Sequence, residues 1–161
     1  MISVFEPKTT DDVDRLAELL AETVRGSRSA AVSEAVQTFV GEAGDNAIRY
    51  GQQGVKITLE MEPGLTRVTV EDQGPGIRAR MGGASDMQAV QASAAALATS
   101  HGEGGMGMSQ ILEAAGAVSP ARVVVESGNA RVSWSFPGDV QVATVTPPIA
   151  GTRITLETTA T

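Results

Sequence analysis

The chain has 161 residues, a net charge of -7 and no cysteine. This length suits one domain, so we treat residues 1–161 as a single unit. The negative charge disfavours general nucleic-acid binding and suits a partner with a basic surface, while the lack of cysteine excludes disulfides and thiolate metal sites. No apolar run could cross a bilayer, and the first residues do not resemble a secretory signal, so we expect a cytoplasmic protein without a membrane partner.

The first third of the chain predicts one strand and two helices. Residues 2–6 form a short strand, and Thr9 with Asp12 makes a capping-box pattern that begins a helix. A second helix is predicted over residues 29–50, because apolar residues recur on one side of it along its whole length. Gly51 follows as its C-terminal cap.

The middle of the chain predicts two strands, residues 55–60 and 66–72, joined by a turn at Pro63-Gly64. Both strands alternate apolar and polar residues, which is typical of half-buried strands. Asp72 falls on the apolar side of the second strand, at its C-terminal end. Its carboxylate is therefore directed towards the interior and needs a partner there, because burying a bare charge is costly.

Residues 78–106 lack strand character, and we interpret them as a lid. Within them an Ala-rich helix is predicted from Ser85 to about residue 98, and such a helix, with few large side chains, should dock weakly. A short helix over residues 107–117 follows. The last third predicts strands separated by Gly128-Asn129, Pro137-Gly138 and Pro147-Pro148. These strands span residues 121–126, 130–136, 140–145 and 152–156.

Three groups of residues, in this order along the chain, indicate a nucleotide site. Glu42 and Asn46 lie one turn apart on the second helix, so they share a face. The second strand of the middle region then runs into an acidic, glycine-rich turn, Asp72-Gln73-Gly74-Pro75-Gly76. The third group is a loop that opens the last helix, and its glycines are Gly102, Gly104, Gly105 and Gly107.

The order of these groups resembles the Bergerat-fold (GHKL) ATPases, which include DNA gyrase B and the catalytic domain of sensor histidine kinases. The chain is most similar to their small stand-alone branch, the bacterial anti-sigma-factor serine kinases, over about residues 2–156. The resemblance implies an α/β (α+β) two-layer sandwich, with a mixed, mostly antiparallel sheet and helices on one face. It also implies ATP and Mg²⁺ as ligands.

The helix group carries chemistry suited to phosphates, although each residue alone also fits a solvated helix face. The amide oxygen of Asn46 can ligate Mg²⁺, and the resemblance implies that it holds the ion that bridges the phosphates. The Glu42 carboxylate could orient or deprotonate an attacking hydroxyl or water. Asn46-Ala-Ile-Arg49-Tyr50 is similar to the Asn-Ala-x-Lys-Tyr ending of the histidine-kinase box, whose basic residue reaches the phosphates; here a planar guanidinium replaces the lysine.

The acidic turn carries chemistry suited to a purine base. A carboxylate such as that of Asp72 is a natural acceptor for the exocyclic amine of adenine, and Gly74 and Gly76 let the backbone approach the base edge. The resemblance implies that this aspartate determines adenine specificity. Gly151-Thr152, before the last strand, resembles the final Gly-Thr box of the family, in which the threonine hydroxyl reaches the adenine.

The loop over residues 102–107 has two interpretations. It matches the Gly-x-Gly-x-x-Gly dinucleotide fingerprint, with Glu126 at a fitting distance downstream. That fingerprint requires a strand directly before it, whereas residues 92–100 are Ala-rich and helical in character. We therefore favour the loop of the resembled family, which closes over the phosphates with the N-terminus of the following helix pointing at them.

The resemblance favours an ATP-dependent serine/threonine kinase of the anti-sigma or switch type. It would phosphorylate or sequester a small STAS-type anti-anti-sigma protein or a sigma factor, and a homodimer is a further option. A complete sensor histidine kinase is excluded, because the chain lacks helices carrying a phosphoacceptor histidine. Two alternatives stay open, a non-catalytic binding module controlled by adenine nucleotide and a stand-alone ATPase. The hairpin over residues 130–145 exceeds what a minimal anti-sigma kinase needs and bears on partner choice.

Overall fold

A computed structural model describes residues 1–51, 54–95 and 107–161. Its helical segments are α1 (Thr10–Arg25), α2 (Ala30–Asn46), the π-helical turn η1 (Ala47–Gly51), α3 (Ile77–Met81), α4 (Asp86–Ala95) and α5 (Met108–Ala117). Its strands are β1 (Ile2–Phe5), β2 (Lys56–Glu62), β3 (Leu65–Asp72), β4 (Ala121–Phe136) and β5 (Val140–Thr158). None of the described helices is long and apolar enough to span a membrane.

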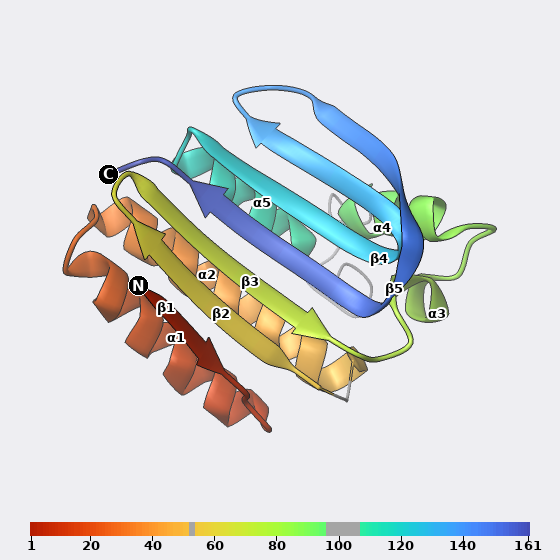
Figure 1. Cartoon of the computed structure of the whole chain (residues 1–161), viewed down its shortest axis with the longest axis horizontal. Coiled ribbons are helices and arrows are strands. Elements are labelled where there is room, and N and C mark those ends of the chain that lie inside the picture. Colours follow the sequence, from red (N-terminus) through yellow and green to blue (C-terminus); the bar gives the residue numbers. More distant parts are fainter. Residues whose placement is uncertain (52–53, 96–106) are drawn as a thin grey trace.

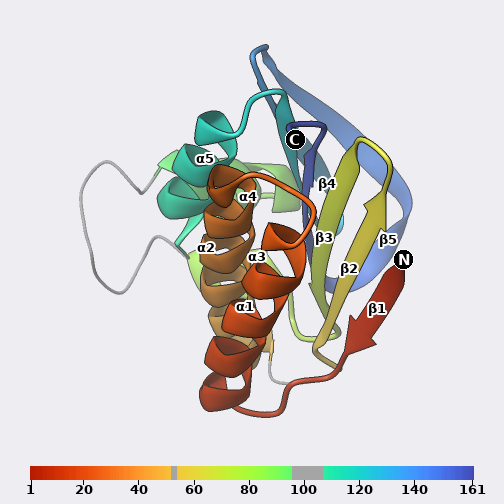
Figure 2. The ribbon, with the colours of Figure 1, turned by 90° about the vertical axis from the view of Figure 1, so that its left-hand side faces the viewer.

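The strands form a five-stranded sheet in the order β1-β2-β3-β5-β4, and the described helices cover one face of it (Figure 1). The view from the side shows the helices and the sheet as separate layers (Figure 2). The predicted two-layer sandwich with helices on one face is thus confirmed. Where the sequence led us to expect a mixed sheet, the pairings among the described strands are antiparallel.

The core lies between the two layers and is made of aliphatic side chains with one buried phenylalanine. Val36, Phe39 and Val40 of α2 have no exposed surface, and neither do Ile57 and Leu59 on the facing strand β2. Removing such a side chain from water contributes about 1.5–3 kcal/mol each. This packing fixes α2 over the sheet, so that the C-terminal end of α2 meets the C-terminal end of β3.

The second helix ends differently from the prediction. Its α-helical part stops at Asn46, and residues Ala47–Gly51 form the π-helical turn η1. Single π turns inside or at the end of helices recur at functional sites, because they redirect the side chains that follow. Arg49 and Tyr50 are therefore presented by a wider turn than an α-helix through residue 50 would give.

β4 reverses direction at Gly128, where the sequence predicts a turn. Arg131 Nε donates to Glu126 Oε1 at 2.9 Å, and Arg122 Nη2 donates to Ser133 Oγ at 3.1 Å. In a straight strand, residues eleven positions apart would be about 36 Å apart, so the two halves of β4 must run back alongside each other. The second half forms the beginning of a hairpin at the edge of the sheet (Figure 1).

β5 also covers two of the predicted strands: the strand continues through Pro147-Pro148, but its pairing with β4 is interrupted there. Pro147 and Pro148 lie inside β5, between Thr144, which pairs with Ala130, and Ile149, which pairs with Gly128. The ladder register shifts at this point. Proline has no N–H to donate to a ladder, so an interrupted stretch of strand can hold it without losing a hydrogen bond.

The described part of the predicted lid is docked on the sheet layer. Val90 of α4 has no exposed surface, and the Asp86 carboxylate accepts a hydrogen bond from the backbone N–H of Asn129 at 3.1 Å. The expectation that this helix docks weakly is therefore wrong, because small residues let it approach β4 closely. Residues 96–106 lie outside the described residues, and a lid over residues 78–106 stays a prediction.

Candidate functional site

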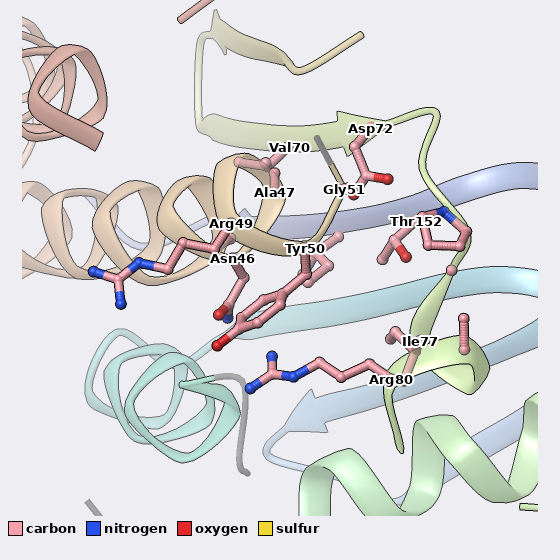
Figure 3. Close-up of a pocket in the computed structure, with 15 residues that line it drawn as sticks. Asn46, Ala47, Arg49, Tyr50, Gly51, Val70, Asp72, Ile77, Arg80 and Thr152 are labelled. Carbon is pink, nitrogen blue, oxygen red and sulfur yellow. The ribbon is translucent and has the colours of Figure 1, made fainter. Parts of the chain in front are cut away.

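A pocket of about 160 Å³ lies where the end of α2 faces α3 and the ends of β3 and β5 (Figure 3). Its walls combine apolar side chains with a few polar groups, which is the usual composition of a small-molecule site. The predicted site residues that line it are Asn46, Arg49, Tyr50, Asp72, Gly76 and Thr152. Residues from α2 with η1, from β3, from α3 and from β5 thus meet around one cavity.

Asp72 lies at one end of the pocket, at the C-terminal end of β3. Its side chain is almost buried, with 9% of the residue exposed, and its Oδ1 accepts a hydrogen bond from the backbone N–H of Gly74 at 2.8 Å. Burial raises the pKa of this carboxyl, while the backbone N–H groups of Gly74 and Thr152 act in the opposite direction. The carboxylate is held in one orientation and is suited to accept a hydrogen bond from a base amine.

Three glycines pack closely around Asp72, and a methyl group on any of them would cause an overlap. A Cβ on Gly51 would overlap the Asp72 carboxyl, one on Gly74 the backbone of Gly51, and one on Gly151 the carbonyl oxygen of Asp72. Gly151 also has a φ of 70°, which side-chain-bearing residues rarely adopt. The glycines therefore let η1, the acidic turn and β5 come together at backbone distance.

A chain of hydroxyl contacts links Thr152 to the start of α3. The Thr152 and Ser127 hydroxyls are 3.5 Å apart, and Ser127 Oγ accepts a hydrogen bond from the backbone N–H of Ile77 at 2.9 Å. Gly76 has a φ of 83°, and a Cβ there would come within 3.0 Å of Ser127 Oγ. Ser127 therefore positions both Thr152 and α3, and no motif in the sequence indicated it.

The opposite end of the pocket is made of longer side chains. Asn46 is the last residue of α2, Tyr50 belongs to η1, and Arg80 comes from α3 (Figure 3). The guanidinium carbon of Arg80 lies 3.4 Å from the centre of the Tyr50 ring, a cation–π contact that joins the two walls. The sequence patterns did not single out Arg80, because a helix as short as α3 shows no periodicity.

A family model described as the histidine kinase-like ATPase domain matches residues 6–131. The chain belongs to this family. No curated protein matches the sequence.

Membership of the histidine kinase-like ATPase family makes this an ATP-binding type of domain, and it agrees with the Bergerat-fold resemblance. The match covers the helix group and the acidic turn, and it stops at residue 131. Thr152 therefore lies outside the matched segment, although the structure places it in the same pocket as Asp72.

In this ATPase-type domain Glu42 is set apart from the pocket. It lies one turn before Asn46, as predicted, but it is not among the lining residues. A Cβ on Gly107 would overlap the Glu42 carboxylate, so this side chain faces the beginning of α5. Burial raises the pKa of Glu42, and nearby Asp45 adds to the rise while Arg49 opposes it.

The remaining predicted residues lie in several places. The Arg49 guanidinium is 3.8 Å from the Asp45 carboxylate, its side chain is 60% exposed, and it points away from Tyr50 (Figure 3). Gly74 supports the pocket through its contact with Gly51, and Gly107 adopts a left-handed conformation before α5. The glycines that fall outside the described residues are Gly102, Gly104 and Gly105.

The donors present fit a magnesium ion shared with a nucleotide. Among the described residues, no three histidine, cysteine or carboxylate side chains gather into a metal cluster. Mg²⁺ bound to nucleotides takes only one or two ligands from the protein and the rest from phosphates and water. The amide oxygen of Asn46, at the pocket end opposite Asp72, is a donor of the required hard type.

Proposed function

We propose that this domain binds Mg-ATP in the pocket and transfers the terminal phosphoryl group to a serine or threonine of a small partner protein. The observation that carries the proposal is the meeting of Asp72, Thr152 and Asn46 in one cavity. These residues come from three separate motifs, and each has a distinct chemistry to offer one nucleotide. Family membership supports the nucleotide half of the proposal.

The base would lie at the Asp72 end. The Asp72 carboxylate accepts a hydrogen bond from the adenine amine, and the Thr152 hydroxyl lies beside it as a second polar contact. A guanine presents a carbonyl where adenine presents its amine, so the carboxylate would repel it. The apolar walls formed by Ala47, Val70 and Ile154 cover the faces of the ring.

The phosphates would lie at the Asn46 end. Mg²⁺, when bound, supplies the neutralisation of charge that phosphoryl transfer needs. The amide oxygen of Asn46 holds and orients that ion, and Arg49 adds positive charge at the rim. Phosphoryl transfer depends mainly on positioning and electrostatics, so a small domain with few chemical groups can support it.

Glu42 would act as the general base, and the partner protein would supply the hydroxyl that it deprotonates. Its raised pKa keeps the carboxylate more basic than an exposed glutamate, which favours taking a proton from a hydroxyl. The serine oxygen would bond to the terminal phosphorus, the bond to ADP would break, and the serine proton would move to Glu42. The net charge of -7 suits a partner with a basic docking surface.

A second function, a nucleotide-controlled binding module, is favoured by the position of Glu42. Its carboxylate faces Gly107 instead of lining the pocket. In that case the domain would sequester a STAS-type protein or a sigma factor, and nucleotide would change the affinity for that partner.

Calorimetric titration with ATP and ADP, each with and without Mg²⁺, tests the binding half of the proposal. Transfer is then measured with γ-labelled ATP and purified STAS-type domains that carry a serine, using the parent and Glu42→Gln. We expect Mg-dependent ATP binding by both proteins and a loss of transfer of about 10²–10⁴-fold in Glu42→Gln.

Each other outcome selects a different function. The binding module would be established if Mg-ATP binds, no STAS-type domain is phosphorylated, and one of these domains binds in a nucleotide-dependent way. Rapid phosphate release to water alone would establish a stand-alone ATPase. An absence of binding at millimolar nucleotide would refute the proposal.

A further inference from the structure

Arg80 is a cation inside the pocket that no motif assigns. It belongs to α3, and it extends beneath the Tyr50 ring towards Asn46 (Figure 3). The guanidinium carbon is 3.4 Å from the ring centre. Stacking on an aromatic ring occupies only the flat face of a guanidinium. Its N–H groups point outward in the plane of the guanidinium and can still donate hydrogen bonds.

One donor of this guanidinium is both buried and unsatisfied. Among the described residues, Arg80 Nη1 has no hydrogen-bond partner, although solvent does not reach it. A buried donor without a partner costs free energy, and more so when it is charged. Buried polar groups in native structures are satisfied by protein, water or a bound ion, and a phosphate oxygen is a partner that this charged donor fits.

The surroundings of Arg80 differ from those of the arginines on the other face of the sheet. Arg67, Arg131 and Arg153 each form ion pairs with glutamates at 2.5–3.3 Å. In the part of the chain that the structure describes, no carboxylate forms such a pair with Arg80. Its positive charge is therefore uncompensated within a partly enclosed cavity, where low polarity strengthens the attraction of an anion.

The position of Arg80 selects the part of a nucleotide that it would meet. Asp72 and Thr152 lie on the other side of Tyr50, at the end assigned to the base (Figure 3). A nucleotide whose base lies there would extend its phosphates towards Asn46 and Arg80. The planar fork of an arginine matches two phosphate oxygens, and such charge-assisted contacts are among the strongest hydrogen bonds in proteins.

We propose that Arg80 binds the phosphate tail and makes the pocket select nucleoside di- and triphosphates over the nucleoside. The Tyr50 ring holds the guanidinium in place, and a phosphate oxygen satisfies its buried Nη1. This inference rests on the proposed function, since it requires that the base of an adenine nucleotide occupies the Asp72 end.

The test is a calorimetric titration of ATP, ADP and adenosine into the parent, Arg80→Met, Arg80→Lys and Arg78→Met. Arg80→Met keeps a long apolar side chain and removes the charge. It should weaken ATP binding by about 10- to 100-fold and change adenosine binding by less than about threefold. Arg80→Lys keeps the charge without the planar fork and should fall between the parent and Arg80→Met. Arg78→Met removes an exposed cation from the same helix and should match the parent.

Other results would overturn the inference. Equal weakening of ATP and adenosine in Arg80→Met would mean that Arg80 only shapes the pocket through Tyr50. Unchanged ATP affinity in a variant whose thermal unfolding matches the parent would remove the phosphate contact. If Arg80→Met does not fold, Arg80→Lys decides, because parent-like affinity for ATP in that variant would contradict a role for the fork. Failure of the parent to bind ATP would instead refute the proposed function, and this inference with it.

Discussion

The two ends of the pocket are built in different ways. At the Asp72 end, backbone meets backbone, and Gly51, Gly74 and Gly151 leave no room for even a methyl group. At the opposite end, the side chains of Asn46, Tyr50 and Arg80 form the walls. The first end should therefore respond to a small change in volume by losing its structure, whereas the second should respond to a change in charge by a graded loss of affinity.

Gly151→Ala should have the largest effect on the Asp72 end. The new methyl group would overlap the carbonyl oxygen of Asp72, and the residue would keep a φ of 70°. Overpacking costs about 1–3 kcal/mol and a left-handed backbone about 1–2 kcal/mol, so the loss of stability should be about 2–5 kcal/mol. Chemical denaturation monitored by circular dichroism measures it.

Gly64→Ala is the matched control. Gly64 has a φ of 73°, close to that of Gly151, but a Cβ there would meet nothing within 4 Å. Gly64→Ala should lose only the stability that the left-handed backbone costs, about 1–2 kcal/mol. Equal losses in the two variants would show that close packing around Asp72 contributes nothing to the fold.

Asp72→Asn should change specificity at the same end without removing the pocket. An amide can still accept the hydrogen bond that Gly74 donates, but it can also donate to a carbonyl such as that of guanine. The preference for ATP over GTP should fall by about 10- to 100-fold, which is the effect of one good polar contact to a base. Competition binding with both nucleotides checks this, and a parent that binds them equally would contradict the adenine assignment.

Local patterns predicted the parts of the site that depend on neighbouring residues in the sequence. Asp72 was identified because it falls on the apolar side of a strand, and Asn46 because it lies one helical turn after Glu42 and precedes the two glycine-rich motifs in the order of the resembled family. The turn at Gly128 also follows from a short-range signal, and the contact between Arg131 and Glu126 confirms it.

Local patterns could not predict the parts of the site that depend on contacts between segments distant in the sequence. Gly51 reads as a helix cap, and only the position of β3 shows that it must be small because Asp72 lies against it. Arg80 and Ser127 enter the site through a short helix and a strand reversal, neither of which gives a periodic signal. Glu42 shares a helix face with Asn46, yet the location of α5 decides that it faces Gly107 instead of the pocket.

Asn46→Ala tests the other end by its dependence on metal. The change removes the amide oxygen and leaves the helix intact, since alanine is a good helix former. We expect ATP affinity in the presence of Mg²⁺ to fall by about 10-fold, the effect of one lost polar contact, and adenosine affinity to stay the same. Titrations with Mg²⁺ and with a chelator measure the difference. An Asn46→Ala protein that keeps the full Mg²⁺ dependence of the parent would remove this residue from the metal site.

The smallest expected effect is a pH dependence of stability at the Asp72 end. Burial raises the pKa of the Asp72 carboxyl above its ordinary value of 3.8. The folded state therefore holds this proton at pH values where the unfolded state has lost it. As the pH rises from 3.8 through the raised pKa, this group lowers the free energy of unfolding, and above that range the cost is constant.

Asp72→Asn removes this titration while it preserves the shape of the side chain. The variant should be more stable than the parent at neutral pH, and the gain should disappear as the pH falls below 3.8, where the parent is protonated in both states. Thermal unfolding of both proteins across this range isolates Asp72 from Glu42 and Asp45, whose pKa values are also raised but which both proteins share. A variant less stable than the parent at neutral pH would show that the backbone N–H contacts to the ionised carboxylate outweigh its burial. The ionised carboxylate of Asp72 would then stabilise the fold in addition to recognising the base.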